Sequence, residues 1–204
     1  HISTGEVLNI SIKKSLSGQV YFVKATAFIE TFEKQFSVSI PEEVKRAMRL
    51  FWSQAEDAIS IIQQYADKTE EKQLNLQLKH RSLNAVTLRK YDETLYFALL
   101  NWFKDHAYEI ARLCFSMGAV QNRNEWSDFI WYINLLEENT VNALFPIEDL
   151  CYAAKHSAEN ETYFSSLFGG TTIQLPFGFV QWHQGQMQFH HSYTKLSRLL
   201  SSCS

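Results

Sequence analysis

A short alternating stretch near the N-terminus constrains the fold of this chain most, because it requires a sheet with two different faces. Residues 6–15 read EVLNISIKKS, and successive side chains on a strand point to opposite faces. The apolar side chains of the stretch share one face, namely Leu8, Ile10 and Ile12. The polar side chains share the other, namely Asn9, Ser11 and Lys13. We expect the apolar face to pack and the polar face to meet water or carry out chemistry.

Apolar spacing predicts helices along most of the middle of the chain. We expect a first helix over 20–36, and a second that has Ser39 as N-cap and Pro41 near its first turn and runs to about residue 66. Residues 68–90 are polar and charged, which favours a loop with one helical piece near 74–79. The further expected elements are a helix from Asp92, a helix over 106–117 that ends at Gly118, a buried strand within 126–136 and a short helix over 147–154.

The C-terminal part, from Gly169 onward, reads as short strands joined by tight turns, with glutamine at many alternate positions. By strand parity, Gln188, His190 and Ser192 share one face of the last strand. Met187, Phe189 and His191 share the other face. A two-stranded ribbon can enter the major groove of DNA, where amides and imidazoles match base edges. This part therefore predicts a base-reading hairpin.

Length and composition predict one soluble α+β domain over residues 1–204, without a signal peptide or a membrane span. The three cysteines are far apart, so neither a disulfide framework nor a zinc site is indicated, and a reducing cytoplasm fits best. The net charge of −3 argues against a protein held to nucleic acid mainly by phosphate attraction. Local basic patches remain near residues 13–24, 45–49 and 79–90, and each of them is also compatible with an ordinary solvated surface.

Two motifs resemble parts of a known enzyme family. Ser11-Ile12-Lys13 resembles the second half of the PD-(D/E)xK nuclease motif. The segments Leu175-Pro-Phe-Gly178 and Met187-Gln-Phe-His-His-Ser-Tyr193 resemble the closing hairpin of small type II restriction endonucleases, including those that cut GCGC and CCGG. Further similar segments follow in the same order along most of the chain, namely 46–52, 99–102 and the region of Trp126.

The resemblance implies a restriction-endonuclease-like fold, with a mixed central β-sheet flanked by helices and a C-terminal β-hairpin. It also implies Mg²⁺-dependent, site-specific hydrolysis of double-stranded DNA by a bacterial cytoplasmic protein that is a monomer or weak dimer. Lys13 would be the catalytic lysine, with Ser11 and the carbonyl of Ile12 as metal ligands. The residues expected to read bases are Gln181, His183, Gln188 and His190. Those expected to contact phosphates are Lys14, Lys24, Gln19 and Arg81.

The chain departs from the family at the acidic ligands. Serine stands where the motif has a carboxylate, although the named relatives also lack one there, and histidine at 190 replaces a lysine. The essential aspartate of the family lies upstream of this strand, so we expect the chain to be N-terminally incomplete. Glu6 lies on the wrong face by parity, and Glu30 or Glu33 would be substitutes from the next helix. Two other functions stay open: a DNA-binding module without cleavage, and a helical protein-interaction domain.

Overall fold

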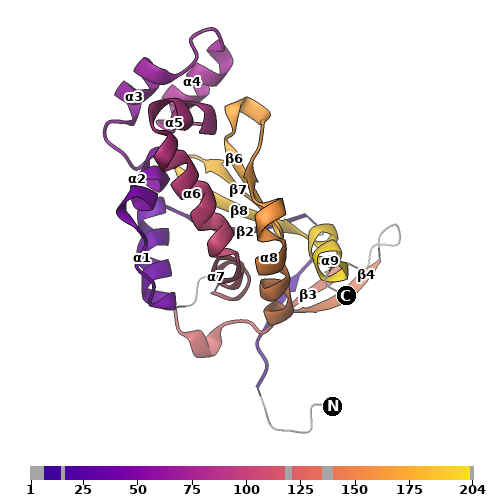
Figure 1. Ribbon diagram of the computed structural model, residues 1–204. Coiled ribbons are helices and arrows are strands. Elements are labelled where there is room, and N and C mark those ends of the chain that lie inside the picture. Colours follow the sequence, from indigo (N-terminus) through magenta and orange to yellow (C-terminus); the bar gives the residue numbers. More distant parts are fainter. Residues whose placement is uncertain (1–6, 15–16, 118–120, 135–139, 203–204) are drawn as a thin grey trace.

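Two β-sheets and a layer of helices make up the fold, which confirms the α+β class (Figure 1). The computed structural model describes residues 7–14, 17–117, 121–134 and 140–202, with backbone alone over 17–21. No helix within these described residues has both the length and the apolar composition needed to cross a membrane.

The strands form two separate sheets rather than one mixed central sheet. The smaller sheet has the order β1 (Ile10–Lys13), β3 (Phe129–Asn134), β4 (Val141–Pro146), with β1 parallel to β3. The larger sheet is antiparallel throughout and has the order β2 (Ser17–Val23), β8 (Gln186–Ser192), β7 (Gly178–His183), β6 (Thr172–Leu175), β5 (Tyr163–Phe164). Within the described residues, β1 is therefore an edge strand of the smaller sheet.

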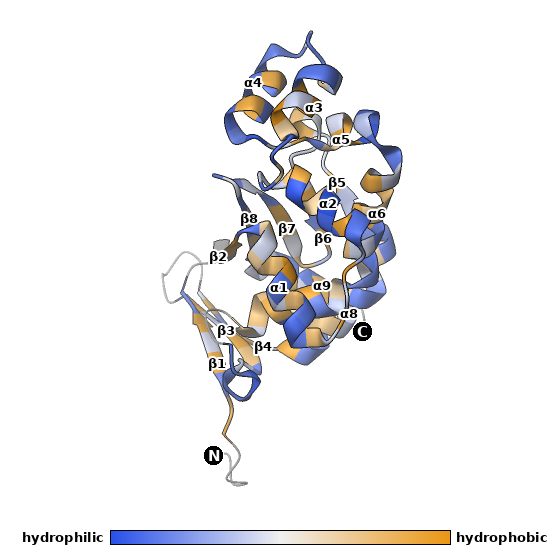
Figure 2. Cartoon of the chain, turned by 90° about the vertical axis from the view of Figure 1, so that its left-hand side faces the viewer, coloured by the Kyte–Doolittle hydropathy of each residue, from blue (hydrophilic) through white to orange (hydrophobic). Residues whose placement is uncertain are grey.

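The helices follow the chain between these strands. Their bounds are α1 (Ala25–Phe36), α2 (Glu42–Phe51), α3 (Ala58–Tyr65), α4 (Glu71–His80), α5 (Ala85–Tyr91), α6 (Glu93–Asp105), α7 (Ala107–Arg112), α8 (Ile147–Glu161) and α9 (Tyr193–Ser201). A π-helical segment, Leu113–Met117, continues α7, and short 3-10 segments lie at Arg123–Glu125 and Leu167–Gly169. Helices α1, α2, α6 and α8 lie along one side of the larger sheet, whereas α3 to α5 lie beyond its end, as the view in Figure 2 shows.

Several predicted helices have different bounds in the structure. The helix predicted over 20–36 begins only at Ala25, because the β-branched and aromatic residues before it complete strand β2. The helix predicted from Pro41 to residue 66 is broken after Phe51, where Ser53 has a positive φ of 59°. The N-cap of α2 is Pro41 rather than Ser39. The predicted end at Gly118 lies outside the described residues.

Two further segments are more helical than predicted. Residues 68–90, predicted as a loop with one helical piece, contain both α4 and α5. Asn84 ends the connection between them and caps α5, because its side chain accepts a hydrogen bond from the backbone N–H of Thr87. The short helix predicted over 147–154 extends through α8 to Glu161. The helix predicted from Asp92 is present as α6, with Asp92 as its N-cap.

The two faces of β1 are reversed from the prediction. Leu8, Ile10 and Ile12 are 39%, 43% and 56% exposed. Ser11 and Lys13 are instead half-buried. The reason is the pairing with β3: Ser11 and Lys13 lie in register with Ile130 and Tyr132, both fully buried, and residues in register share a face. The partner strand, rather than the hydropathy of β1 itself, decides which face is covered.

The main core lies between the helices and the inner face of the larger sheet. Phe28 on α1 stacks on Phe189 of β8, with ring centroids 5.6 Å apart. Trp102 on α6 contacts Phe28 and also Phe32, and all four side chains are at most 4% exposed. Cys114 and Cys151 are free and buried. Because these large aromatic rings are buried against one side of the larger sheet, that side is its inner face.

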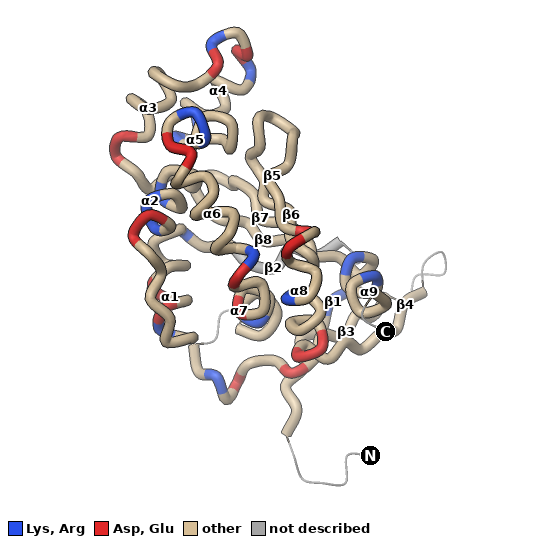
Figure 3. The backbone as a smooth tube through the Cα atoms, viewed as in Figure 1, with Lys and Arg blue, Asp and Glu red and all other residues tan. Residues whose placement is uncertain are grey.

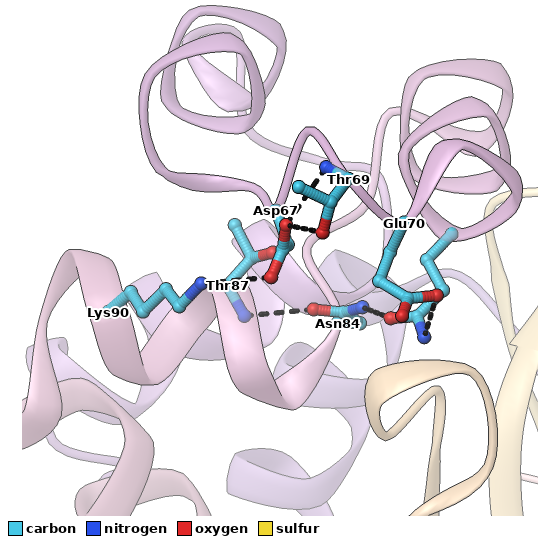
Figure 4. Close-up of polar contacts among 7 residues, drawn as sticks. Asp67, Thr69, Glu70, Asn84, Thr87 and Lys90 are labelled. Atoms are coloured by element: carbon cyan, nitrogen blue, oxygen red, sulfur yellow. Dashed lines mark hydrogen bonds and ion pairs between the residues drawn. The ribbon is translucent and has the colours of Figure 1, made fainter.

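Polar contacts join the segments on either side of α4 to α5, and Figure 4 shows those of Asp67, Thr69, Asn84 and Thr87. The side-chain amide of Asn84 donates to the carbonyl oxygen of Phe168 at 3.1 Å, and its oxygen accepts from Thr87 N–H at 2.8 Å. The buried side chain of Gln77 accepts from the backbone N–H of Asn84 at 3.0 Å. Before the helix, the hydroxyl of Thr69 donates to a carboxylate oxygen of Asp67 at 2.7 Å. The bond between Gln77 and Asn84 fixes the C-terminal end of α4 against the start of α5.

Candidate nucleic-acid interface

The outer face of the larger sheet, opposite the core, is lined by polar and aromatic side chains. On the inner face, the apolar side chains of Val180, Met187 and Phe189 are 0% exposed. Residues paired directly across antiparallel strands share a face, so the register gives the outer rows. One row is Thr172, Gln181, Gln188 and Phe22, and the next is Tyr163, Gln174, Phe179 and His190, followed by the backbone position of Gln19. We call this surface the polar sheet face.

Three of the predicted base-reading residues form one hydrogen-bonded group at the centre of this face. The side-chain amide of Gln181 donates to Oε1 of Gln188 at 2.9 Å, and its nitrogen lies 3.5 Å from Nε2 of His190. The ring of His190 stacks on Phe179, with centroids 4.5 Å apart. Gln188 is only 3% exposed, whereas Gln181 and His190 are half-buried. The group therefore presents partly exposed amide and imidazole atoms in fixed positions.

The β7–β8 turn forms one end of the polar sheet face. Gln184 and Gly185 both have positive φ, 48° and 77°, as a two-residue type I′ hairpin turn requires. His183, the fourth predicted base-reading residue, lies beside this turn and makes an edge-on contact with Phe22 at 5.2 Å. The end of α4 lies at the same end of the sheet but on its inner side, because the ring of His80 is 6.2 Å from that of Trp182, which packs on Phe51 in the core. Burial, and then the charges of Lys79 and His183, lower the pKa of His80.

Three cations lie near this end of the sheet, and we call them the tip cations: Lys24, Lys79 and Arg81. Lys24 directly follows β2, whose last residue pairs with Met187, and the other two lie at the end of α4. Over the described part of the chain, none of the three forms an ion pair. Several cations on α2 and α5 instead lie close to acids, where Figure 3 shows both charges, as in the pairs Lys45–Glu33 at 2.9 Å and Arg89–Glu93 at 2.6 Å.

Lys13 lies at the other end of β8, where the two sheets meet. It is in register with Tyr132, and the hydroxyl of Tyr132 shares a 2.5 Å hydrogen bond with Nδ1 of His191. Burial lowers the pKa of Lys13 and raises that of Tyr132. Burial, and then the charges of Lys13 and His190, lower the pKa of His191 to about 3. Lys13 is therefore a desolvated amine beside a buried, neutral imidazole, an environment typical of functional sites.

The donors at Ser11 do not fit a magnesium ion. The position offers a hydroxyl and the carbonyl of Ile12, whereas Mg²⁺ is usually held by one or two carboxylates. Asp128 accepts a hydrogen bond from the backbone N–H of Asn9, about 13 Å along the strand from Lys13. Glu33 is engaged with Lys45 and with the backbone N–H of Ile40. Among the described residues, no three His, Cys, Asp or Glu side chains come together as a metal site, and Glu6 lies outside them.

The structure thus divides the predicted site residues between two places. Gln181, Gln188 and His190 come together, with His183 beside the turn and Gln19 opposite His190 in register. Lys24 and Arg81 lie at the turn end. Ser11, Ile12, Lys13 and the exposed Lys14 lie toward the opposite end, near His191. About 17 Å of β8 separates Gln186 from His191.

Sequence reasoning missed the aromatic and core partners of these residues. Phe22 was assigned to a helix, so its place on the polar sheet face was not predicted. The contact between Tyr132 and His191 could not be predicted from the sequence, because it joins strands from different sheets. The predicted free ribbon was wrong: β7 and β8 are interior strands, covered on their edges by β6 and β2.

No protein family model matches this chain, and no curated protein is significantly similar to it.

Proposed function

We propose that this chain binds DNA through the polar sheet face, as part of a site-specific nuclease resembling the small type II restriction endonucleases. The observation that supports this most is the hydrogen-bonded group of Gln181, Gln188 and His190 on an outer sheet face. Amides and imidazoles match the donors and acceptors on base edges, and fixed positions make that match selective. The tip cations and Lys14 would contact phosphates, which position the protein but carry no sequence information.

Cleavage is the second part of the proposal, and it depends on Lys13. A half-buried lysine whose pKa is lowered by burial can orient an attacking water or stabilise charge that develops on a phosphate. The resemblance implies that Mg²⁺ would assist, and this stays a prediction, because the described donors near Ser11 include no carboxylate. We therefore assign to the described residues only binding, orientation and charge stabilisation.

Salt dependence of binding tests the first part. If the three tip cations each neutralise one phosphate, they contribute a slope of log K against log salt of about −2.7 for duplex DNA, and affinity falls roughly 40-fold between 50 and 200 mM salt. Arg81→Ala should reduce the slope by about one unit. Lys155→Ala, an exposed lysine on α8, is the matched control and should leave the slope unchanged. Fluorescence anisotropy with a labelled duplex measures both. An affinity with no salt dependence favours the helical protein-interaction domain instead.

A nicking assay tests the second part. Supercoiled plasmid is incubated with the protein and Mg²⁺, and binding is measured separately in Ca²⁺. We expect Lys13→Met to abolish nicking while binding persists. Lys34→Met, an exposed lysine on α1, should nick like the unsubstituted protein. Binding without any nicking by the unsubstituted chain leaves a DNA-binding module without cleavage as the function.

A further inference from the structure

We infer that the polar sheet face takes DNA bases that are out of the duplex stack, rather than reading a closed major groove. This inference rests on the proposed function and specifies the form of DNA that the same surface binds. It follows from the width of the sheet, from the aromatic rings on its outer face and from the positions of Lys24 and Lys14.

The larger sheet is too wide for the β7–β8 hairpin to enter the major groove of a closed duplex. The major groove is about 12 Å wide and admits a helix or a two-stranded ribbon. Here β7 and β8 are flanked by β6 and β2, and five strands at about 4.8 Å spacing give a surface about 19 Å across. Gln181 and His190, the half-buried members of the hydrogen-bonded group, lie in the middle of that surface. Base edges inside a closed duplex cannot reach them, whereas unpaired bases can.

Aromatic rings on the same face provide places for unpaired bases to stack. Phe22 is 40% exposed, and Tyr163, at the far edge, is 53% exposed. Phe179 is half-buried and already stacked on His190, which leaves an aromatic pair at the centre. Sheets that bind single-stranded nucleic acid use partly exposed aromatics in this way, because every base has a flat face. Gln181 is then within reach of the polar edge of a stacked base.

Charge and length complete the match with a single strand. The exposed Lys24 lies at the turn end of β8 and the exposed Lys14 toward the other end, so positive charge is available near both ends of the face. The separation of about 17 Å corresponds to about five stacked nucleotides at 3.4 Å each. That length is within the range of single-strand sites on β-sheet proteins.

Three probes of the same sequence test the inference in one binding assay: a 12-nucleotide single strand, its fully paired duplex, and a longer duplex with a four-nucleotide mismatched bubble. We expect the single strand and the bubble to bind at least tenfold more tightly than the paired duplex at equal salt. Phe22→Leu should weaken binding of the single strand about tenfold. Phe22→Tyr, which keeps the ring, should restore it.

The matched control is Tyr152→Leu, since Tyr152 is 52% exposed on α8, away from the polar sheet face. It should bind all three probes like the unsubstituted protein. If the paired duplex binds as tightly as the bubble, and Phe22→Leu has no effect, the inference is wrong while DNA binding stands. If none of the probes binds, the proposed function itself fails. Circular dichroism of each variant confirms that a loss of binding is not a loss of fold.

Discussion

The buried side chain of His191 should make the folded state sensitive to acid. This side chain is 3% exposed and bonds to Tyr132, while Nε2 has no hydrogen-bond partner among the described residues. Burial, with the charges of Lys13 and His190, lowers its pKa from 6.5 to about 3. As the pH falls below 6.5, the unfolded chain binds a proton at this residue that the folded chain does not. Stability is therefore complete above that pH and is lost as the pH drops toward 3.

The size of the effect follows from the shift. Each pH unit within the window costs about 1.4 kcal/mol, so between pH 7 and pH 4.5 His191 alone lowers the free energy of unfolding by about 3 kcal/mol. His191→Gln keeps a hydrogen-bonding side chain beside Tyr132 but does not titrate. We expect this variant to lose about 3 kcal/mol less than the unsubstituted protein over the same pH range.

Urea denaturation at several pH values between 7 and 4.5 measures this difference directly. The control is His156→Gln, because His156 is exposed on α8, and its pH profile should follow that of the unsubstituted chain. If His191→Gln and the unsubstituted protein lose stability in parallel, His191 is protonated in the folded state and the buried, neutral imidazole is refuted.

Two other substitutions test the fold on which the candidate site depends. Gly178→Ala should prevent folding of the β7–β8 hairpin, since its Cβ would lie 1.8 Å from the carbonyl oxygen of His190, whereas Gly185→Ala should cost only about 1–2 kcal/mol for its positive φ of 77°; thermal melts compare the two, and equal melting temperatures would contradict the strand pairing. Asn84→Ala should lower the free energy of unfolding by about 1–3 kcal/mol, through loss of the α5 cap and of the bond to the Phe168 carbonyl, and a change below about 0.5 kcal/mol in urea denaturation would contradict that role.

Strand parity near the C-terminus could be predicted from the sequence, because it depends only on local alternation. Gln188 and His190 do share a face, and Met187, Phe189 and His191 do share the inner one. The same rule grouped the residues of β1 correctly but assigned the wrong group to the interior. Alternation shows which residues lie together, whereas burial depends on the partner strand, here β3.

Contacts between distant segments could not be predicted, and these decide the character of the site. The pairing of Phe22 with Gln188 requires β2 to lie beside β8, although the two strands are far apart in the sequence. The same applies to Tyr132 and His191. Residues 20–23, predicted as the start of a helix, belong to the strand β2. Apolar residues at helical spacing can equally form a strand when they are β-branched or aromatic.

Photocrosslinking tests the central claim, that the polar sheet face binds DNA, most directly. A single strand that carries 5-iodouracil is irradiated with the protein, and the crosslinked peptides are identified by mass spectrometry. We expect crosslinks at Phe22, Phe179 or His183, on the outer face of the larger sheet. Crosslinks confined to Tyr152 or other residues of the helical layer would contradict that claim.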